Sequence, residues 1–342
     1  PAGRGTTVAT RAAPVAPLAI DRIGLDALLA ALRGRGYTCL GPTVRGDAIA
    51  IAELRSTQDL PEGWTDEQAP GTYRLRRRAD RALFGFTVGP TSWKQWLFPP
   101  EERLWAIRRS RDAGFQASAR PEPAARLAFI GVRACELHAI QIQDVVFTGG
   151  AVPDPSYARR RADIFVVAAS CVASGATCFC ASMGTGPRVR DGYDVHLVEL
   201  PDHVFLVEPG TPRGDELLAE LPARAATPGE RASADAAVTS AARQVRVMDA
   251  GVRELLAASL ESPRWADVAT RCLSCANCTL ACPTCFCSSV EDTTDVTGEH
   301  AERWRRWDSC FTPEHSYLHG GEVRPSIRAR YPKIPRRVSG YN

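Results

Sequence analysis

Apolar residues near the start of the chain recur at two different spacings. In residues 22–34 leucines recur at helical spacing as far as Gly34, which predicts one helix. Residues 37–54 predict two short strands around an Arg-Gly-Asp turn, and residues 71–78 and 82–89 predict a second pair joined at Ala79-Asp80. The opening region is therefore expected to be mixed α+β.

The next stretch carries a helix-start pattern and then a boundary. Pro99-Pro100-Glu101-Glu102 predicts the first turn of a helix, because proline is tolerated there and acids suit a helix N-terminus. The Pro- and Ala-rich residues 119–126 predict a domain boundary.

From residue 127 the pattern changes to short apolar runs separated by a helical pattern. Residues 126–132 and 162–170 have the near-continuous apolar character of buried parallel strands, with a helix between them, which predicts a βαβ unit. Residues 193–200 and 203–209 predict a hairpin, and residues 214–260 are Ala-rich and mainly helical in pattern.

The expected fold class is α+β or α/β: a mixed N-terminal region, a small parallel-sheet core with a four-cysteine loop, and a C-terminal helical ferredoxin-like domain. The expected domains are residues 1–125, the α/β core 126–210, a helical connector 211–262, and residues 263–342 with a basic C-terminal arm.

Composition bounds the function. The chain has 342 residues, 44% of them hydrophobic, and a net charge of +3, which gives little support for nucleic-acid binding. No apolar run approaches the roughly 20 residues that span a bilayer, so we expect no membrane insertion. The first 20 residues lack the apolar segment of a secretory signal and are expected to form a flexible leader. Twelve cysteines in such a chain indicate metal binding in a cytoplasmic protein.

Four cysteines are predicted to meet in the α/β core. Cys135 and Cys171 each follow a parallel strand, and the carboxyl ends of such strands lie side by side. In the Gly-rich loop that follows Cys171, Cys178 and Cys180 are two residues apart, so an extended backbone points both sulfurs one way and turns Phe179 into packing. The four thiols form a complete ligand set for an iron–sulfur cluster, with structural zinc or inert buried thiols as alternatives.

Residues around this set are second candidates. Gly175, Gly184 and Gly186 are expected to let backbone N–H groups approach the sulfurs, which tunes a cluster. Arg133 and His138 flank Cys135 and are candidate cofactor-binding residues, although ordinary packing at a helix end is the simpler expectation for both.

A second set has the spacing of a bacterial ferredoxin. The segment from Cys272 to Pro283 reads Cys-x2-Cys-x2-Cys-x3-Cys-Pro, the run that holds one corner of a 4Fe-4S cluster. The cysteines in and after it are Cys272, Cys275, Cys278, Cys282, Cys285, Cys287 and Cys310. Either Cys310 completes the first cluster and the rest form a second site, or a second ferredoxin run lies beyond residue 342.

With these motifs together, the chain resembles the iron–sulfur β subunit of soluble group 3b NiFe hydrogenases, the sulfhydrogenases, and the related iron–sulfur subunit of anaerobic sulfite reductase. The segments that carry the resemblance are residues 89–105, 129–144, 178–187, 272–287 and 307–310. It implies a non-catalytic subunit with two or more 4Fe-4S clusters, which passes electrons between a flavin subunit that handles NAD(P)H and a hydrogenase small and large subunit pair. Cys39 lies outside every motif and is expected to be a buried or incidental thiol.

Two other functions remain open from the residues. A catalytic reductase would bind a small substrate at the α/β crevice, with His138 as acid and Arg133 as anion clamp. A zinc-dependent module would grip nucleic acid with the basic residues 324–338, but no aromatic stacking surface or nucleic-acid motif accompanies them, so a partner-docking arm is the favoured interpretation.

Overall fold

The computed structural model describes residues 16–110, 114–118 and 125–331. The chain divides into two compact units: unit 1 comprises residues 1–93 and 125–250, and unit 2 comprises residues 94–124 and 251–342. The sequence led us to expect four parts with other boundaries. Residues 101–110 form a strand that pairs with residues 300–306, and residues 114–118 pair with that strand, so both segments belong to unit 2.

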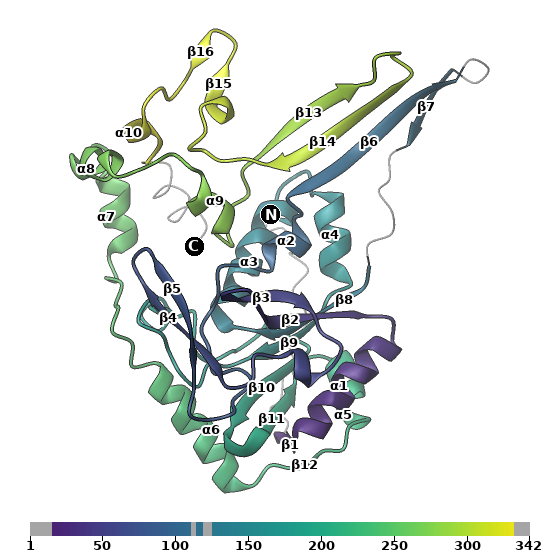
Figure 1. Cartoon of the computed structure of the whole chain (residues 1–342), viewed down its shortest axis with the longest axis vertical. Coiled ribbons are helices and arrows are strands. Elements are labelled where there is room, and N and C mark those ends of the chain that lie inside the picture. Colours follow the sequence, from purple (N-terminus) through teal and green to yellow (C-terminus); the bar gives the residue numbers. More distant parts are fainter. Residues whose placement is uncertain (1–15, 111–113, 119–124, 332–342) are drawn as a thin grey trace. The chain divides into compact units, whose positions relative to one another are not determined.

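Unit 1 is built on an eight-stranded sheet in the order β12-β1-β11-β10-β9-β8-β2-β3 (Figure 1). Its strands are β1 (Leu18–Ile20), β2 (Thr38–Arg45), β3 (Ala48–Glu53), β8 (Leu127–Val132), β9 (Phe165–Ala169), β10 (Val195–Leu200), β11 (Val204–Pro209) and β12 (Arg224–Ala225). The four central strands β2, β8, β9 and β10 run parallel, and the outer pairings are antiparallel. A separate hairpin consists of β4 (Trp64–Ala69) and β5 (Thr72–Arg77).

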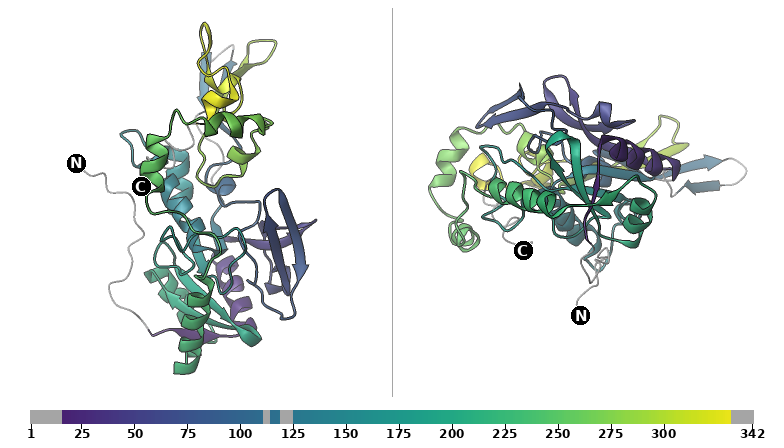
Figure 2. Two further views of the ribbon diagram at one scale, coloured as in Figure 1. Left: turned by 90° about the vertical axis from the view of Figure 1, so that its left-hand side faces the viewer. Right: turned by 90° about the horizontal axis from the view of Figure 1, so that it is seen from below.

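Helices cover both faces of this sheet, as Figure 2 shows. The helices of unit 1 are α1 (Arg22–Gly34), α3 (Ala134–Thr148), α4 (Pro155–Ala162), α5 (Pro212–Ala219) and α6 (Pro228–Ala241). Successive side chains of a strand point to opposite faces, so Phe205 and Val207 pack with the leucines of α1 and α5, whereas Leu206 packs with Val238 of α6. Burial on both faces is why the central strands are nearly all apolar.

Unit 2 contains a four-stranded antiparallel sheet in the order β13-β14-β6-β7. Its longer strands are β6 (Glu101–Ser110), β7 (Gly114–Ser118), β13 (Ser288–Thr294) and β14 (His300–Trp307), and a short hairpin joins β15 (Tyr317–Leu318) to β16 (Gly321–Glu322). Its helices are short: α2 (Lys94–Leu97), α7 (Val252–Ala258), α8 (Arg264–Thr270), α9 (Asn277–Ala281) and α10 (Ile327–Arg330).

The mixed α/β fold class is confirmed, and so are the elements that one local pattern defines. The helix expected at 22–34 is α1, and the two strands around the Arg-Gly-Asp turn are β2 and β3. The βαβ unit is β8-α3-β9, and the hairpin at 193–209 is β10 with β11. In the described part of the chain, no helix is long and apolar enough to cross a bilayer.

Two predicted elements are wrong. Residues 82–89 form no strand. The strand expected to pair with them, β5, instead forms an antiparallel pair with the preceding strand β4 across a turn at Gly71, where φ is +72°. Residues 99–102 do not start a helix, because Glu101 begins β6, whose partner β14 lies about two hundred residues away along the chain. The C-terminal region also contains the β13–β14 hairpin, although it was expected to be helical. The boundary at 119–126 and the leader fall mainly outside the described residues, as does the end of the basic arm.

A buried carboxylate fixes the segment that replaces the expected strand. Glu199 on β10 is 5% exposed, and its two oxygens accept the backbone N–H groups of Leu83 and Phe84, each at 2.7 Å. The Phe84 carbonyl in turn accepts Nη2 of Arg133 at 2.8 Å. Burial raises the pKa of Glu199, and the two N–H donors act in the opposite direction. Glu199 therefore fixes the backbone of residues 83 and 84, and this backbone in turn fixes the Arg133 side chain.

We predict that Glu199→Ala lowers the free energy of unfolding by about 1–3 kcal/mol, because two buried N–H donors lose their acceptor. The conservative Glu199→Gln keeps one acceptor oxygen and is expected to lose less. The midpoint of thermal unfolding, measured anaerobically for the three proteins, checks this order. Equal midpoints for all three would contradict the role of Glu199.

Candidate metal centres

The structure brings four predicted cysteines together in unit 1. Cys135 is the second residue of α3, directly after β8, and Cys171 follows β9, the parallel neighbour of β8. Charge interactions with Cys171, Cys178 and Cys180 contribute to raising the pKa of Cys135, so the four sulfurs form one electrostatic group. All four are reduced thiols.

Burial controls the ionisation of this set. Desolvation raises the pKa of the Cys135 thiol well above its usual value, and it also raises the pKa values of Cys171 and Cys178. The positive charge of Arg133 opposes the shift at Cys171, and the backbone N–H of Gly175 opposes it at Cys178. Cys135, Cys171 and Cys178 therefore resist ionisation as they stand and need a cationic centre to become thiolates.

The buried side chain of Arg133 bears on whether the four thiols fit an iron–sulfur cluster. Its side chain is 2% exposed, yet Nε and Nη1 have no acceptor among the described residues, while Nη2 is bound to backbone carbonyls. A buried guanidinium with unused donors is costly unless an anionic acceptor is present. The sulfur atoms of a 4Fe-4S cluster are such acceptors, so the donor set and its surroundings fit that group.

The cysteine loop has its own local supports. Gly186 lies against Cys180: a Cβ at this position would stand 3.1 Å from the Cys180 sulfur. Gly184 has φ of +69°, a left-handed turn that favours glycine. Nε2 of Gln244, beyond α6, donates to the Cys180 sulfur at 3.2 Å, and its Oε1 accepts the N–H of Ala181 at 3.0 Å.

Phe179 does not pack as expected. It is 43% exposed, while Cys178 and Cys180 on either side are half-buried. The alternation of the Cys-Phe-Cys segment is present, but the loop lies at the surface, so its opposite face meets solvent. His138 is exposed on α3, which leaves Arg133 as the buried member of that flanking pair.

The ferredoxin-type run of unit 2 forms a tight turn. Ser274 and Ala276 have left-handed φ values of +52° and +63°, and the Ser274 N–H donates to the Cys272 sulfur at 3.4 Å. Burial tends to raise the pKa of Cys272, but hydrogen bonds from the Tyr331 hydroxyl and from Ser274 lower it. Burial raises the pKa of Cys278, and charge interactions with Cys272 and Cys275 contribute to the shift, so these three thiols lie together.

The remaining cysteines of unit 2 lie just beyond the turn. Cys282 follows the C-terminus of α9, and its sulfur is 3.2 Å from the Thr284 hydroxyl. Cys287 and Cys310 are buried and pack with Phe311, while Cys272 and Cys285 pack at the edge of this group. Seven thiols therefore converge in this unit.

No three His, Cys, Asp or Glu side chains within residues 16–110, 114–118 and 125–331 are arranged around a single metal ion. One zinc ion holds each sulfur at about 2.3 Å and so needs a tight set. A 4Fe-4S cluster binds each thiolate through a different iron atom and accepts a wider set.

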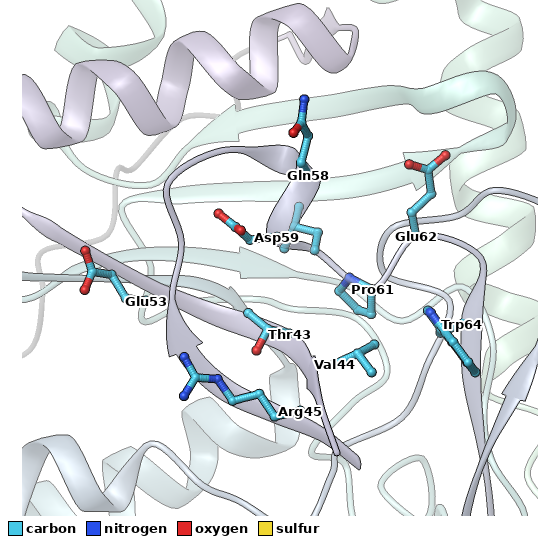
Figure 3. Close-up of a pocket in the computed structure, with 10 residues that line it drawn as sticks. Thr43, Val44, Arg45, Glu53, Gln58, Asp59, Pro61, Glu62 and Trp64 are labelled. Carbon is cyan, nitrogen blue, oxygen red and sulfur yellow. The ribbon is translucent and has the colours of Figure 1, made fainter. Parts of the chain in front are cut away.

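Two cavities of unit 1 differ in what they offer. Beside Arg133 and Glu136 lies a cavity of about 30 Å³, which is room for one water molecule. A separate pocket of about 490 Å³ contains no cysteine (Figure 3). It is lined by Thr43, Val44, Arg45, Glu53, Gln58, Asp59, Leu60, Pro61, Glu62 and Trp64. Neither of these two cavities is lined by a cysteine.

Comparison with known proteins places the motifs in a family. Residues 271–338 match the model of the 4Fe-4S dicluster domain. The chain is 35% identical over 273 residues to sulfhydrogenase 2 subunit beta of Pyrococcus furiosus, an alignment that covers 76% of this chain and 77% of that protein. No solved structure matches the chain.

We predict that Cys178→Ser lowers the iron content by about four atoms per chain, because one thiolate of a four-thiolate set is lost. Cys39→Ser is the matched control. Cys39 is 1% exposed, burial raises its pKa to about 11, and it lies within the main hydrophobic core of unit 1. Iron analysis of the anaerobically purified variants is the measurement. Equal iron loss in the two variants would mean that the Cys178 effect is general destabilisation.

Proposed function

This chain belongs to the sulfhydrogenase beta-subunit family, and from that premise we propose that it is the iron–sulfur electron-transfer subunit of a multisubunit oxidoreductase. The observation that carries the proposal is the meeting of four thiols at the carboxyl ends of β8 and β9, beside a buried guanidinium with two unused donors. Such a centre takes up and releases electrons, while the protein supplies ligation, burial and hydrogen bonds. By itself the chain is non-catalytic in this proposal.

We assign the thiols to three ligand sets. Cys135, Cys171, Cys178 and Cys180 hold the cluster of unit 1. Cys282, Cys285, Cys287 and Cys310 hold one cluster of unit 2, because the first three surround the same lysine and Cys310 is buried with Cys287. Cys272, Cys275 and Cys278 hold the other. Two such clusters need eight ligands and the matched domain contains seven cysteines, so the last set takes its fourth ligand from outside these seven.

Around the cluster of unit 1, three groups have distinct tasks. Arg133 neutralises part of the cluster charge and donates to its sulfur atoms, and Gln244 donates to the Cys180 sulfur. Gly186 leaves the space in which Cys180 lies. Hydrogen bonds and charges of this kind set the reduction potential of an iron–sulfur centre. His138 and Gly184 are not needed as cofactor-binding residues.

The partners in this proposal are a flavin subunit that handles NAD(P)H and a NiFe hydrogenase small and large subunit pair, in the cytosol. The name of the Pyrococcus relative, a sulfhydrogenase subunit, favours that assembly over one with sulfite reductase subunits. A catalytic reductase with substrate at the crevice is the second candidate; the cavity beside Arg133, of about 30 Å³, contains none of the four cysteines.

The test is anaerobic purification with iron, sulfide and zinc quantified, followed by low-temperature EPR after reduction with dithionite. We expect a brown protein with about twelve irons per chain if three clusters are bound, or about eight if two are bound. A colourless protein that contains zinc would overturn the proposal. In the assembled complex, nickel is expected to co-purify, whereas siroheme would place the chain with a sulfite reductase.

A further inference from the structure

Unit 2 contains one buried lysine in a chain that uses arginine for nearly all of its positive charges. Of the 42 lysines and arginines only Lys94 and Lys333 are lysines. Lys94 begins α2 and is 3% exposed. A buried ammonium is costly unless it is paired, so its position requires an explanation.

The contacts of Lys94 are neutral. Nζ donates to the Leu280 carbonyl at 2.9 Å and lies 3.5 Å from the Thr279 carbonyl. It also lies 3.8 Å from the centre of the Trp307 ring. These carbonyls belong to α9, the helix that carries Cys278 and ends at Cys282, and a cation at a helix C-terminus is favourable. A compact ammonium fits between carbonyls and an aromatic face, where a planar guanidinium is bulkier.

No carboxylate pairs with Lys94 in the described ion pairs, and the groups whose charges act on its pKa are cysteines. Burial lowers the pKa of Lys94. Charge interactions with Cys285, Cys282 and Cys287, in decreasing order, oppose this shift without reversing it. A cluster on these three cysteines is the anion that pairs with the lysine. The pairing rests on the ligand set proposed above.

We propose that Lys94 sets the reduction potential of the cluster held by Cys282, Cys285, Cys287 and Cys310. Adding an electron makes the cluster more negative, and a fixed ammonium in a poorly solvated site stabilises that state more than the oxidised one. Lys94 therefore raises the potential of this cluster. Lys94 acts on the cluster through its fixed positive charge, and its ammonium also binds carbonyl groups at the C-terminus of α9.

Lys94→Met removes the charge and keeps the length of the side chain. We expect the midpoint potential of this cluster to fall, with at least a tenfold loss in the equilibrium constant for reduction, which is about 59 mV for one electron. Lys94→Arg keeps the charge and is expected to retain most of the potential. The measurement is an EPR-monitored redox titration of the full-length protein purified anaerobically.

Two further variants assign the signals. Cys282→Ser identifies the signal of the Lys94 cluster, and Cys178→Ser identifies that of the unit 1 cluster. The unit 1 cluster in the same sample is the internal control and is expected to keep its potential. An unchanged potential of the Lys94 cluster in Lys94→Met, with full iron content, would overturn the proposal and leave the electron-transfer function intact.

Lys94→Gln separates the effect of the charge on the cluster potential from the effect of the hydrogen bond to α9. Glutamine keeps a donor for the Leu280 carbonyl but carries no charge. It is expected to hold its iron and to show the same fall in potential as Lys94→Met. Loss of this cluster from both neutral variants would overturn the tuning role and make Lys94 a structural cap. If every EPR signal of the wild-type protein were still present in Cys282→Ser, the proposed ligand set itself would be contradicted.

Discussion

The parallel pairing of β8 with β9 is the constraint on which the site of unit 1 depends. It places Cys135 and Cys171 at the same edge of the sheet, although they are 36 positions apart, and β9 begins the loop that returns Cys178 and Cys180 to them. A parallel pair of this kind needs both of its faces covered, and the helices on each side provide that cover. The apolar core and the ligand set are thus consequences of the same topology.

Buried charge is the second feature that shapes this unit. Glu199 accepts the backbone N–H groups of Leu83 and Phe84, and the Phe84 carbonyl accepts Nη2 of Arg133. The charge of Arg133 acts on Cys171, and two of its donors have no acceptor among the described residues. Each link is a polar group that would be destabilising alone inside the protein. A negatively charged cluster on the four thiols, as proposed above, would supply the acceptor for the two unused donors of Arg133.

The two Thr-Cys-Phe-Cys segments show that a local motif can be placed in two different settings. In unit 1 the segment lies in a Gly-rich loop after a parallel strand, with Phe179 exposed. In unit 2 it follows a ferredoxin-type turn, with Cys287 buried against Cys310. Each setting has a buried cation whose charge acts on its cysteines, Arg133 in unit 1 and Lys94 in unit 2. With the ligand sets proposed above, a cation beside each cluster would make its reduction easier.

Local patterns determined much of this protein before any tertiary contact was known. The leucine spacing of α1, the apolar runs of β8 and β9, and the Cys-x2-Cys-x2-Cys-x3-Cys-Pro run predicted the helix, the βαβ unit and the family resemblance, because each depends on neighbouring residues. Tertiary structure decided the rest. It made residues 101–110 a strand, since their hydrogen-bonding partner is β14. It also brought Gln244 to Cys180 and Lys94 to α9, contacts across 64 and 186 positions that leave no local pattern. Side chains that meet only after folding have no fixed spacing along the chain, so their pairing depends on how the elements pack.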